Sequence, residues 1–150
     1  MPQSLTQLYA HLIFSTKNRH PFIDSEIRPK LHGCLAKLVR DQDCPFVVVG
    51  GVADHVHILF DIGKMRSPVK IVEVVKRESS KWMKTMGPGY EKFYWQSGYG
   101  MFSVSPTHRV AVEKYVRCQE EHHRAVSFQD EFRGFLKRYR VEYDEGYVWD

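Results

Sequence analysis

The order of apolar and polar positions along the chain predicts strands that alternate with helices. Bulky apolar residues fill three short runs, at residues 8–14, 46–52 and 56–60. Runs of this length, rich in β-branched and aromatic residues and bounded by Gly, Asn or Asp, are typical of strands. Residues 93–103 are aromatic and interrupted by glycine. This pattern predicts one or two further strands with a bend or a close backbone approach.

Four other segments have helical spacing and helix end signals. A Ser or Asp before the first turn, a Pro at the first helical position and a Gly after the last turn mark helix ends. The expected helices span residues 24–40, with Asp24 as the cap, 67–87, 105–122 and 129–138. An aromatic and acidic tail follows at residues 143–150.

The resulting order is β-α-β-β-α-β with helices appended at the C-terminal end. This order is that of the split βαβ fold, which ferredoxin-like and RNA-recognition-motif-like domains share. We therefore expect an α+β fold over residues 1–150, with one antiparallel sheet and helices packed on one of its faces. The open face then needs a second sheet, a helix, a partner subunit or nucleic acid to cover it.

Composition narrows the class of protein. The chain has 150 residues, a net charge of +4 and three cysteines that form no Cys-x-x-Cys pair. We interpret the cysteines as those of a reducing, cytoplasmic compartment, without a disulfide framework or a structural zinc site. The longest apolar run, residues 46–53, is too short to cross a membrane, and no signal peptide is evident. The basic charge permits a polyanionic partner without proving one.

The strongest local motif is Asp54-His55-Val56-His57. Alternation along a strand places His55 and His57 on one face, a few ångströms apart. Paired imidazoles are natural metal ligands, although surface or core histidines would give the same pattern. Asp54 either orients a histidine or serves as a turn residue. Histidine-triad hydrolases, two-motif phosphoesterases, zinc deaminases and P-loop enzymes all require residues that are missing here.

A second candidate site lies in the third expected helix. Tyr115 and Gln119 are one turn apart, so they share a helix face. A tyrosine hydroxyl can be a covalent nucleophile, but a pKa of about 10 leaves it protonated at neutral pH, so it needs a metal-bound substrate or a nearby base. The Gln119 amide oxygen is a hard ligand that could join two histidines around an ion. The alternative is a half-buried tyrosine beside an exposed glutamine.

Cations gather in two places. Four of them share one face of the second expected helix with a single acidic residue, Glu73; these are Lys70, Arg77, Lys81 and Lys84. This stripe is either a solvated face or a phosphate-binding face. The turn after the first strand adds Lys17 and Arg19. The aromatic residues of 93–102 either stack on unpaired bases or belong to the core.

Taken in order, these motifs resemble the single-tyrosine HUH (His-hydrophobic-His) transposases of small bacterial insertion sequences, including relatives associated with repetitive palindromic elements. The resemblance covers nearly the whole chain. It rests on Ser15-Thr16-Lys17-Asn18-Arg19, Gly50-Gly51, Asp54-His55-Val56-His57, Lys76, Ser79-Ser80, Trp95-Gln96-Ser97-Gly98-Tyr99, Phe102-Ser103-Val104-Ser105, Tyr115-x-x-x-Gln119, His122-His123 and Tyr143-Asp144-Glu145.

The resemblance implies a metal-dependent enzyme that cuts and rejoins single-stranded DNA hairpins at element ends. His55, His57 and Gln119 would hold Mg²⁺ or Mn²⁺, and Tyr115 would form a 5′-phosphotyrosine. Family members are homodimers with composite sites, so the tyrosine of one chain would serve the histidines of its partner. Two alternatives stay open: a domesticated hairpin nickase or binder, and an RNA-recognition-type module without catalysis.

Overall fold

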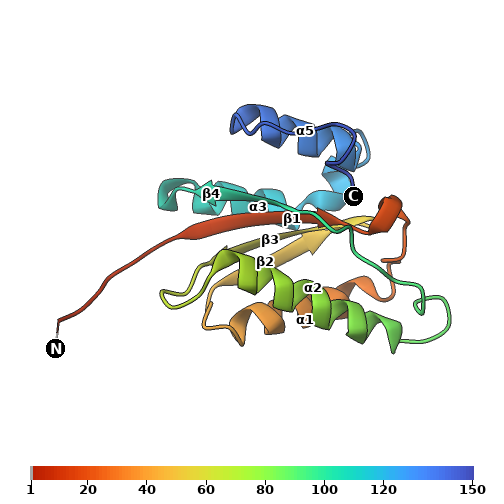
Figure 1. The fold of residues 1–150 in the computed structure, drawn as a ribbon, viewed down its shortest axis with the longest axis horizontal. Helices are drawn as coiled ribbons and strands as arrows, with labels where there is room; N and C mark the ends of the chain where they lie inside the picture. The colour runs from red at the N-terminus through yellow and green to blue at the C-terminus, as the bar shows by residue number, and fades with distance from the viewer. Residues whose placement is uncertain (1) are drawn as a thin grey trace.

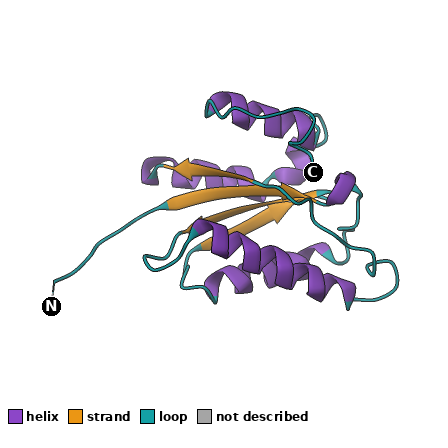
Figure 2. Ribbon diagram, in the orientation of Figure 1, coloured by secondary structure: helices purple, strands orange, loops and turns teal. Residues whose placement is uncertain are grey.

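The computed structural model describes residues 2–150 and contains one antiparallel sheet of four strands (Figures 1 and 2). The strands are β1 (Tyr9–Ser15), β2 (Val47–Gly51), β3 (His55–Asp61) and β4 (Gly100–Val104), and they lie in the order β2-β3-β1-β4. This is the order of a split βαβ fold, with β3 between the parallel strands β1 and β2. The expected α+β class is confirmed.

Helices cover both faces of this sheet. The larger helices are α1 (Arg28–Arg40), α2 (Pro68–Lys84), α3 (Arg109–Arg117) and α5 (Phe128–Arg138). The short ones are α4 (Gln119–His122) and the 3₁₀ turns η1 (Lys17–Arg19) and η2 (Pro106–His108). Figure 1 shows α1 and α2 on one side of the sheet and α3 and α5 on the other. The appended helices therefore cover the second face, and a helix was one of the four kinds of cover expected for it.

Strand alternation divides the side chains between the two helical layers. On β1 and β3, Leu12, Phe14 and Ile58 are fully buried in a core that α1 and α2 complete, and Leu31 and Val75 are among its helical members. The opposite side chains meet the C-terminal helices. Val116 of α3 packs on Val48 and Leu59, while Phe132 of α5 packs on Ile13 and Phe102.

Three element ends differ from the sequence expectation. The first helix begins at Arg28, one turn after Asp24. The Asp24 side chain accepts hydrogen bonds from the backbone N–H groups of Glu26 and Ile27 in the turn that leads into the helix, as a cap does. The helix expected over 105–122 breaks at Cys118, whose φ of −103° and ψ of 30° are not helical. In 93–103, β4 begins at Gly100, and Trp95 makes an isolated bridge to Thr16.

The C-terminal tail folds back onto α5. Trp149 packs near Phe128 and Phe132, and Glu145 forms an ion pair with Arg133 of α5. The Gly98 amide donates a hydrogen bond of 2.8 Å to the carbonyl of Asp150. The tail therefore braces the helix on the outside of the molecule. Within residues 2–150, no helix combines the length and apolar character needed to cross a bilayer.

Candidate active site

The two histidines of the HUH motif lie side by side on β3, facing α3 and α5. Both are fully buried. Each ring has its Nδ1 held by a hydrogen bond: Asp54 Oδ1 lies 2.7 Å from His55 Nδ1, and His11 Nε2 lies 2.8 Å from His57 Nδ1. Such contacts fix the orientation of a ligating imidazole. They direct the two Nε2 atoms into the same space, and they show that Asp54 contacts a histidine.

One buried carboxylate occupies the space between these imidazoles. Glu131 of α5 places its Oε1 2.8 Å from His57 Nε2 and 3.4 Å from His55 Nε2. Its Oε2 lies 3.1 Å from His123 Nε2 and 3.2 Å from His122 Nε2. Ligand atoms of His55, His57, His123 and Glu131 all lie within 4.8 Å of one another, so this group could hold a metal ion.

Tyr115 reaches the same carboxylate from α3. Its hydroxyl donates a hydrogen bond to Glu131 Oε2 and lies 3.1 Å from His122 Nε2. The tyrosine also lines an open cavity of about 360 Å³ that extends toward Phe135 and Arg138. The predicted nucleophile and the HUH pair are therefore brought together within a single chain, with one carboxylate between them.

Gln119 lies beside this group but does not follow Tyr115 on a continuous helix. Its amide Nε2 donates a 3.0 Å hydrogen bond to the Tyr115 carbonyl across the break at Cys118. The residue is 1% exposed, so the alternative of an exposed glutamine is wrong. Among residues 2–150, its Oε1 is buried without a hydrogen-bond partner. An unpaired buried acceptor is costly, and a cation would satisfy it.

The imidazoles differ in protonation. Burial lowers the pKa of His57 to about 4 and the pKa of His11 to about 3, so both rings are neutral at pH 7. A neutral ring is the form that binds a metal. Burial also opposes the charged form of His55, but the carboxylates of Asp54 and Glu131 outweigh it and raise the His55 pKa.

The nucleophile and its acceptor are shifted in opposite directions. Burial and the neighbouring carboxylate raise the pKa of Tyr115 above its usual value, so the phenol keeps its proton. Although burial opposes it, hydrogen bonds from His123, His55 and His57 hold the pKa of Glu131 well below its usual range. The paired imidazoles of His55 and His57, an ionised carboxylate and an unpaired amide oxygen together form a donor set that fits a divalent cation.

The sequence reasoning assigned no role to His11, His123 or Glu131. His123 belongs to a His-His pair that marks no chemistry by itself. A signal for Glu131 existed, because it lies between Phe128, Phe132 and Phe135 on the apolar side of α5, where a charged residue needs a buried partner.

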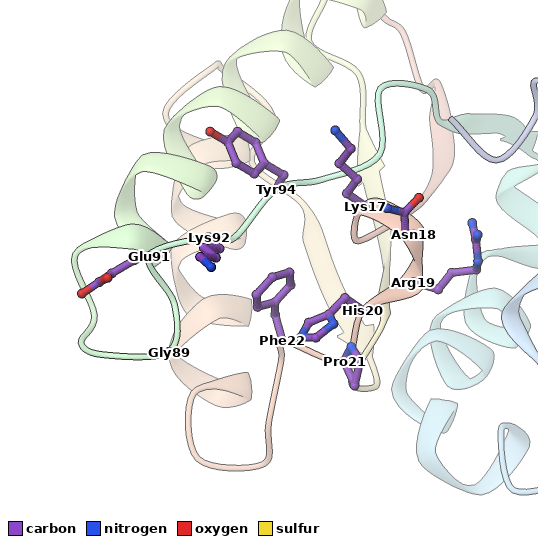
Figure 3. A pocket seen from close by; sticks show the side chains of 10 residues that line it. All are labelled: Lys17, Asn18, Arg19, His20, Pro21, Phe22, Gly89, Glu91, Lys92 and Tyr94. Atoms are coloured by element: carbon purple, nitrogen blue, oxygen red, sulfur yellow. The ribbon is translucent and has the colours of Figure 1, made fainter.

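The predicted cations Lys17 and Arg19 border a basic cavity next to the site. This cavity has a volume of about 720 Å³. Figure 3 shows the residues that line it, with Tyr94 beside the loop of residues 17–22 and the rings of His20 and Phe22 close together. Arg19 has a φ of 57°, a left-handed conformation that is rare outside glycine. Arg19 also lines a neighbouring cavity with Asp54 and His123, so it links the basic cavity to the histidine site.

The basic stripe lies elsewhere. It runs along α2, on the side of the sheet opposite the HUH pair (Figure 1). Its cations are partly paired within the helix: Lys70 and Arg77 contact Glu73 at 3.1 and 3.2 Å, and Lys81 lies 3.9 Å from Glu78. Lys84 instead lies over the ring of Tyr94, with its Nζ 4.0 Å from the ring centroid.

Comparison with known proteins identifies the class as DNA transposases. The model of the family described as "Transposase IS200 like" matches residues 4–119. The chain therefore belongs to the IS200-like transposase family.

Individual relatives agree with this family. The chain is 26% identical over 120 residues to the ISDra2 transposase TnpA of Deinococcus radiodurans, across 77% of this chain and 86% of that protein. A crystal structure described as that of a transposase from Deinococcus radiodurans superposes with a TM-score of 0.61 at 22% identity, covering 77% of this chain and 95% of the other. A REP-associated tyrosine transposase bound to a REP hairpin gives a TM-score of 0.60 at 11% identity, over 84% and 74% of the two chains.

Proposed function

We propose that this transposase cuts and rejoins single-stranded DNA through a covalent 5′-phosphotyrosine at Tyr115, with a divalent cation held by the HUH pair. One observation carries the proposal: the Tyr115 hydroxyl and the Nε2 atoms of His55 and His57 converge on the same carboxylate. A nucleophile and an ion site that share one point can act on one phosphorus atom.

The residues present suggest a direct displacement. His55, His57 and Gln119 would hold Mg²⁺ or Mn²⁺, which would polarise the scissile phosphate and stabilise its developing charge. The Tyr115 Oη forms a bond to phosphorus as the bond from phosphorus to the 3′ oxygen breaks. The phenol proton passes to water as the bond forms, and the 3′ oxygen takes a proton from water. The new ester keeps the energy of the broken bond, so rejoining needs no nucleotide.

The basic cavity offers a path for the unpaired strand. Lys17 and Arg19 supply charge for phosphates, and Tyr94 supplies an exposed ring for a base. A hairpin as the substrate is supported by the structural relative that is bound to one. The α2 stripe lies on the opposite side of the sheet from the histidines, so we expect Lys70, Arg77, Lys81 and Lys84 to contact a hairpin stem outside the active site.

The arrangement of chains needs its own test. The resemblance predicts a homodimer with composite sites, but Tyr115 contacts the carboxylate on its own HUH pair. We therefore propose that the site is assembled within one chain. Mixing His55→Ala and Tyr115→Phe proteins should then recover no cleavage. Partial recovery in the mixture would instead demonstrate composite sites.

The central experiment traps the covalent intermediate. A single-stranded hairpin oligonucleotide with Mg²⁺ or Mn²⁺ should give a protein–DNA adduct, and mass spectrometry should place the DNA on Tyr115. Tyr115→Phe should abolish the adduct and leave hairpin binding intact, and EDTA should abolish it in the unchanged protein. Tyr139→Phe is the matched control, since Tyr139 lines the same cavity and donates its hydroxyl to the Ser103 carbonyl. An adduct on another tyrosine, such as Tyr99 or Tyr147, would refute the assignment.

The alternatives predict different results. An RNA-recognition module binds on an open sheet face, makes no adduct and ignores EDTA. In the part of the chain that the structure describes, α3 and α5 cover that face. A domesticated nickase would give the adduct but would not move its own element, so a transposition assay with flanking hairpins separates it from a mobile enzyme.

A further inference from the structure

We propose that Glu131 is a positioning residue that joins the two halves of the active site, with one oxygen binding the ion and the other holding the Tyr115 hydroxyl. This inference rests on the proposed function and adds a residue to it. With Glu131, α5 contributes to the active site together with β3 and α3.

The two carboxylate oxygens face different partners. Oε1 lies toward the HUH pair, 2.8 Å from His57 Nε2 and 3.4 Å from His55 Nε2. Oε2 accepts the hydrogen bond from Tyr115 and lies 3.1 Å from His123 Nε2. Ligands about 2.1 Å from one ion at angles of 90–110° are separated by about 3.0–3.4 Å. The separation of Oε1 from His55 Nε2 falls in this range, and its separation from His57 Nε2 is a hydrogen-bond distance just below it.

The surroundings of Glu131 are unusual for a merely structural carboxylate. It is 6% exposed and projects from the apolar side of α5, next to Phe128 and Phe132. Burying a carboxylate is costly unless several donors compensate it. Its partners come from β3, from α3 and from the segment after α3, so it connects elements that are distant in sequence. The adjacent Asp130 has the ordinary arrangement, exposed and paired with Arg133 at 3.2 Å.

This placement couples the ion to the nucleophile. A ligand oxygen and the tyrosine's acceptor belong to the same rigid carboxylate, so the position of one fixes the position of the other. Aspartate, one methylene shorter, keeps the charge but cannot span both partners from the same helix position. Glutamine keeps the shape but replaces one oxygen with an amide group that donates and does not ligate.

Metal binding tests the inference without measuring cleavage. Co²⁺ is the probe, because its visible absorption reports the number and type of its ligands, and Mn²⁺ affinity is followed by electron paramagnetic resonance. Glu131→Gln should weaken Co²⁺ and Mn²⁺ binding by at least about tenfold and change the Co²⁺ spectrum. Asp130→Asn is the matched control and should change neither. Unchanged affinity and spectrum in Glu131→Gln would overturn the proposal.

The nucleophile needs a second readout. The protein is labelled with 3-fluorotyrosine, and the ¹⁹F resonance of Tyr115 is assigned as the one that disappears in Tyr115→Phe. This resonance should shift in Glu131→Gln and in Glu131→Asp. It should not shift in Asp130→Asn. Glu131→Asp also covers a failure of the glutamine variant to fold: it should weaken Co²⁺ binding and lower the adduct rate. Wild-type values for both would refute the positioning role.

The two proposals can fail separately. If His57→Ala loses Co²⁺ binding and Glu131→Gln retains it, the HUH ion site stands and the role of Glu131 is refuted. If the unchanged chain binds neither Co²⁺ nor Mn²⁺ and forms no adduct on Tyr115, the proposed function itself is wrong.

Discussion

The two faces of one sheet differ in what β1 and β3 bury there: one face is apolar throughout, and the other combines apolar residues with a polar cluster. Toward α1 and α2, β1 and β3 present apolar side chains such as Phe14 and Ile58, which are fully buried among other apolar groups. Toward α3 and α5, the same strands present His11, His55 and His57, which are as deeply buried but are satisfied by hydrogen bonds. Both faces bury apolar side chains, and the second face in addition holds a polar cluster whose members are paired with one another.

The difference between the faces shows that buried polar residues have a different energetic requirement from buried apolar ones. Burying apolar surface is favourable by itself, whereas burying imidazoles and a carboxylate is favourable only when every polar atom finds a partner. The second face therefore needs an exact set of residues, and α3, α4 and α5 bring them from widely separated positions. Loss of one partner should change the site more than the fold.

The largest expected effect on stability comes from a comparison of substitutions at two residues of β1 that lie on opposite faces of the sheet. Phe14→Ala should lower the free energy of unfolding by about 3–5 kcal/mol, because it leaves a cavity in the apolar layer. His11→Leu, on the other face, should cost about 1–3 kcal/mol through the unpaired Nδ1 of His57, and it should weaken Co²⁺ binding by about 10–100-fold. Chemical denaturation measures the unfolding free energy of each variant, and metal titration measures its Co²⁺ affinity. Equal stability losses with unchanged metal binding in His11→Leu would remove the distinction between the faces.

Substitutions at two glycines, one packed against α3 and one on α1, provide a second test of the difference between the faces. A Cβ on Gly50 of β2 would lie 1.8 Å from the Val116 carbonyl oxygen, so Gly50→Ala must displace α3 and with it Tyr115. We expect a loss of about 1–3 kcal/mol in unfolding free energy and a slower adduct rate. Gly33 of α1 has nothing within 4 Å of its Cβ position. Gly33→Ala is the matched control: it should raise stability by about 0.5–1 kcal/mol through helix propensity and leave the adduct rate unchanged. A slower adduct rate in Gly33→Ala, or a normal rate in Gly50→Ala, would contradict this account.

The same contrast explains how far the sequence could predict the structure. Strand alternation and helix end signals are local, so they predicted the sheet, most helix positions and the pairing of His55 with His57 on one face. The break at Cys118 and the position of Glu131 depend on how α3 and α5 pack, and no local pattern encodes them. The cover on the second face was left open because several kinds of partner would bury it equally well.

The smallest expected effect is on the pH dependence of stability, and it comes from an imidazole outside the polar cluster. His32 of α1 is half-buried, and among residues 2–150 its Nε2 is buried without a hydrogen-bond partner. Burial, with Arg28 nearby, lowers its pKa from 6.5 to about 4. Between these values the unfolded chain binds a proton that the folded chain does not, so stability falls as pH drops from about 6.5 to about 4.

Replacing His32 should therefore flatten the acid side of the stability curve. Partial exposure screens the effect, so we expect His32→Gln to recover about 1–2 kcal/mol at pH 4.5 and to change little at pH 7. Urea denaturation of both proteins across this range, without metal, measures the difference. His57 should also contribute to the loss of stability at low pH, because its pKa in the folded protein is also lowered to about 4. If His32→Gln keeps the whole acid loss, the hydrogen-bonded face alone accounts for it, and a lone buried imidazole costs this fold nothing.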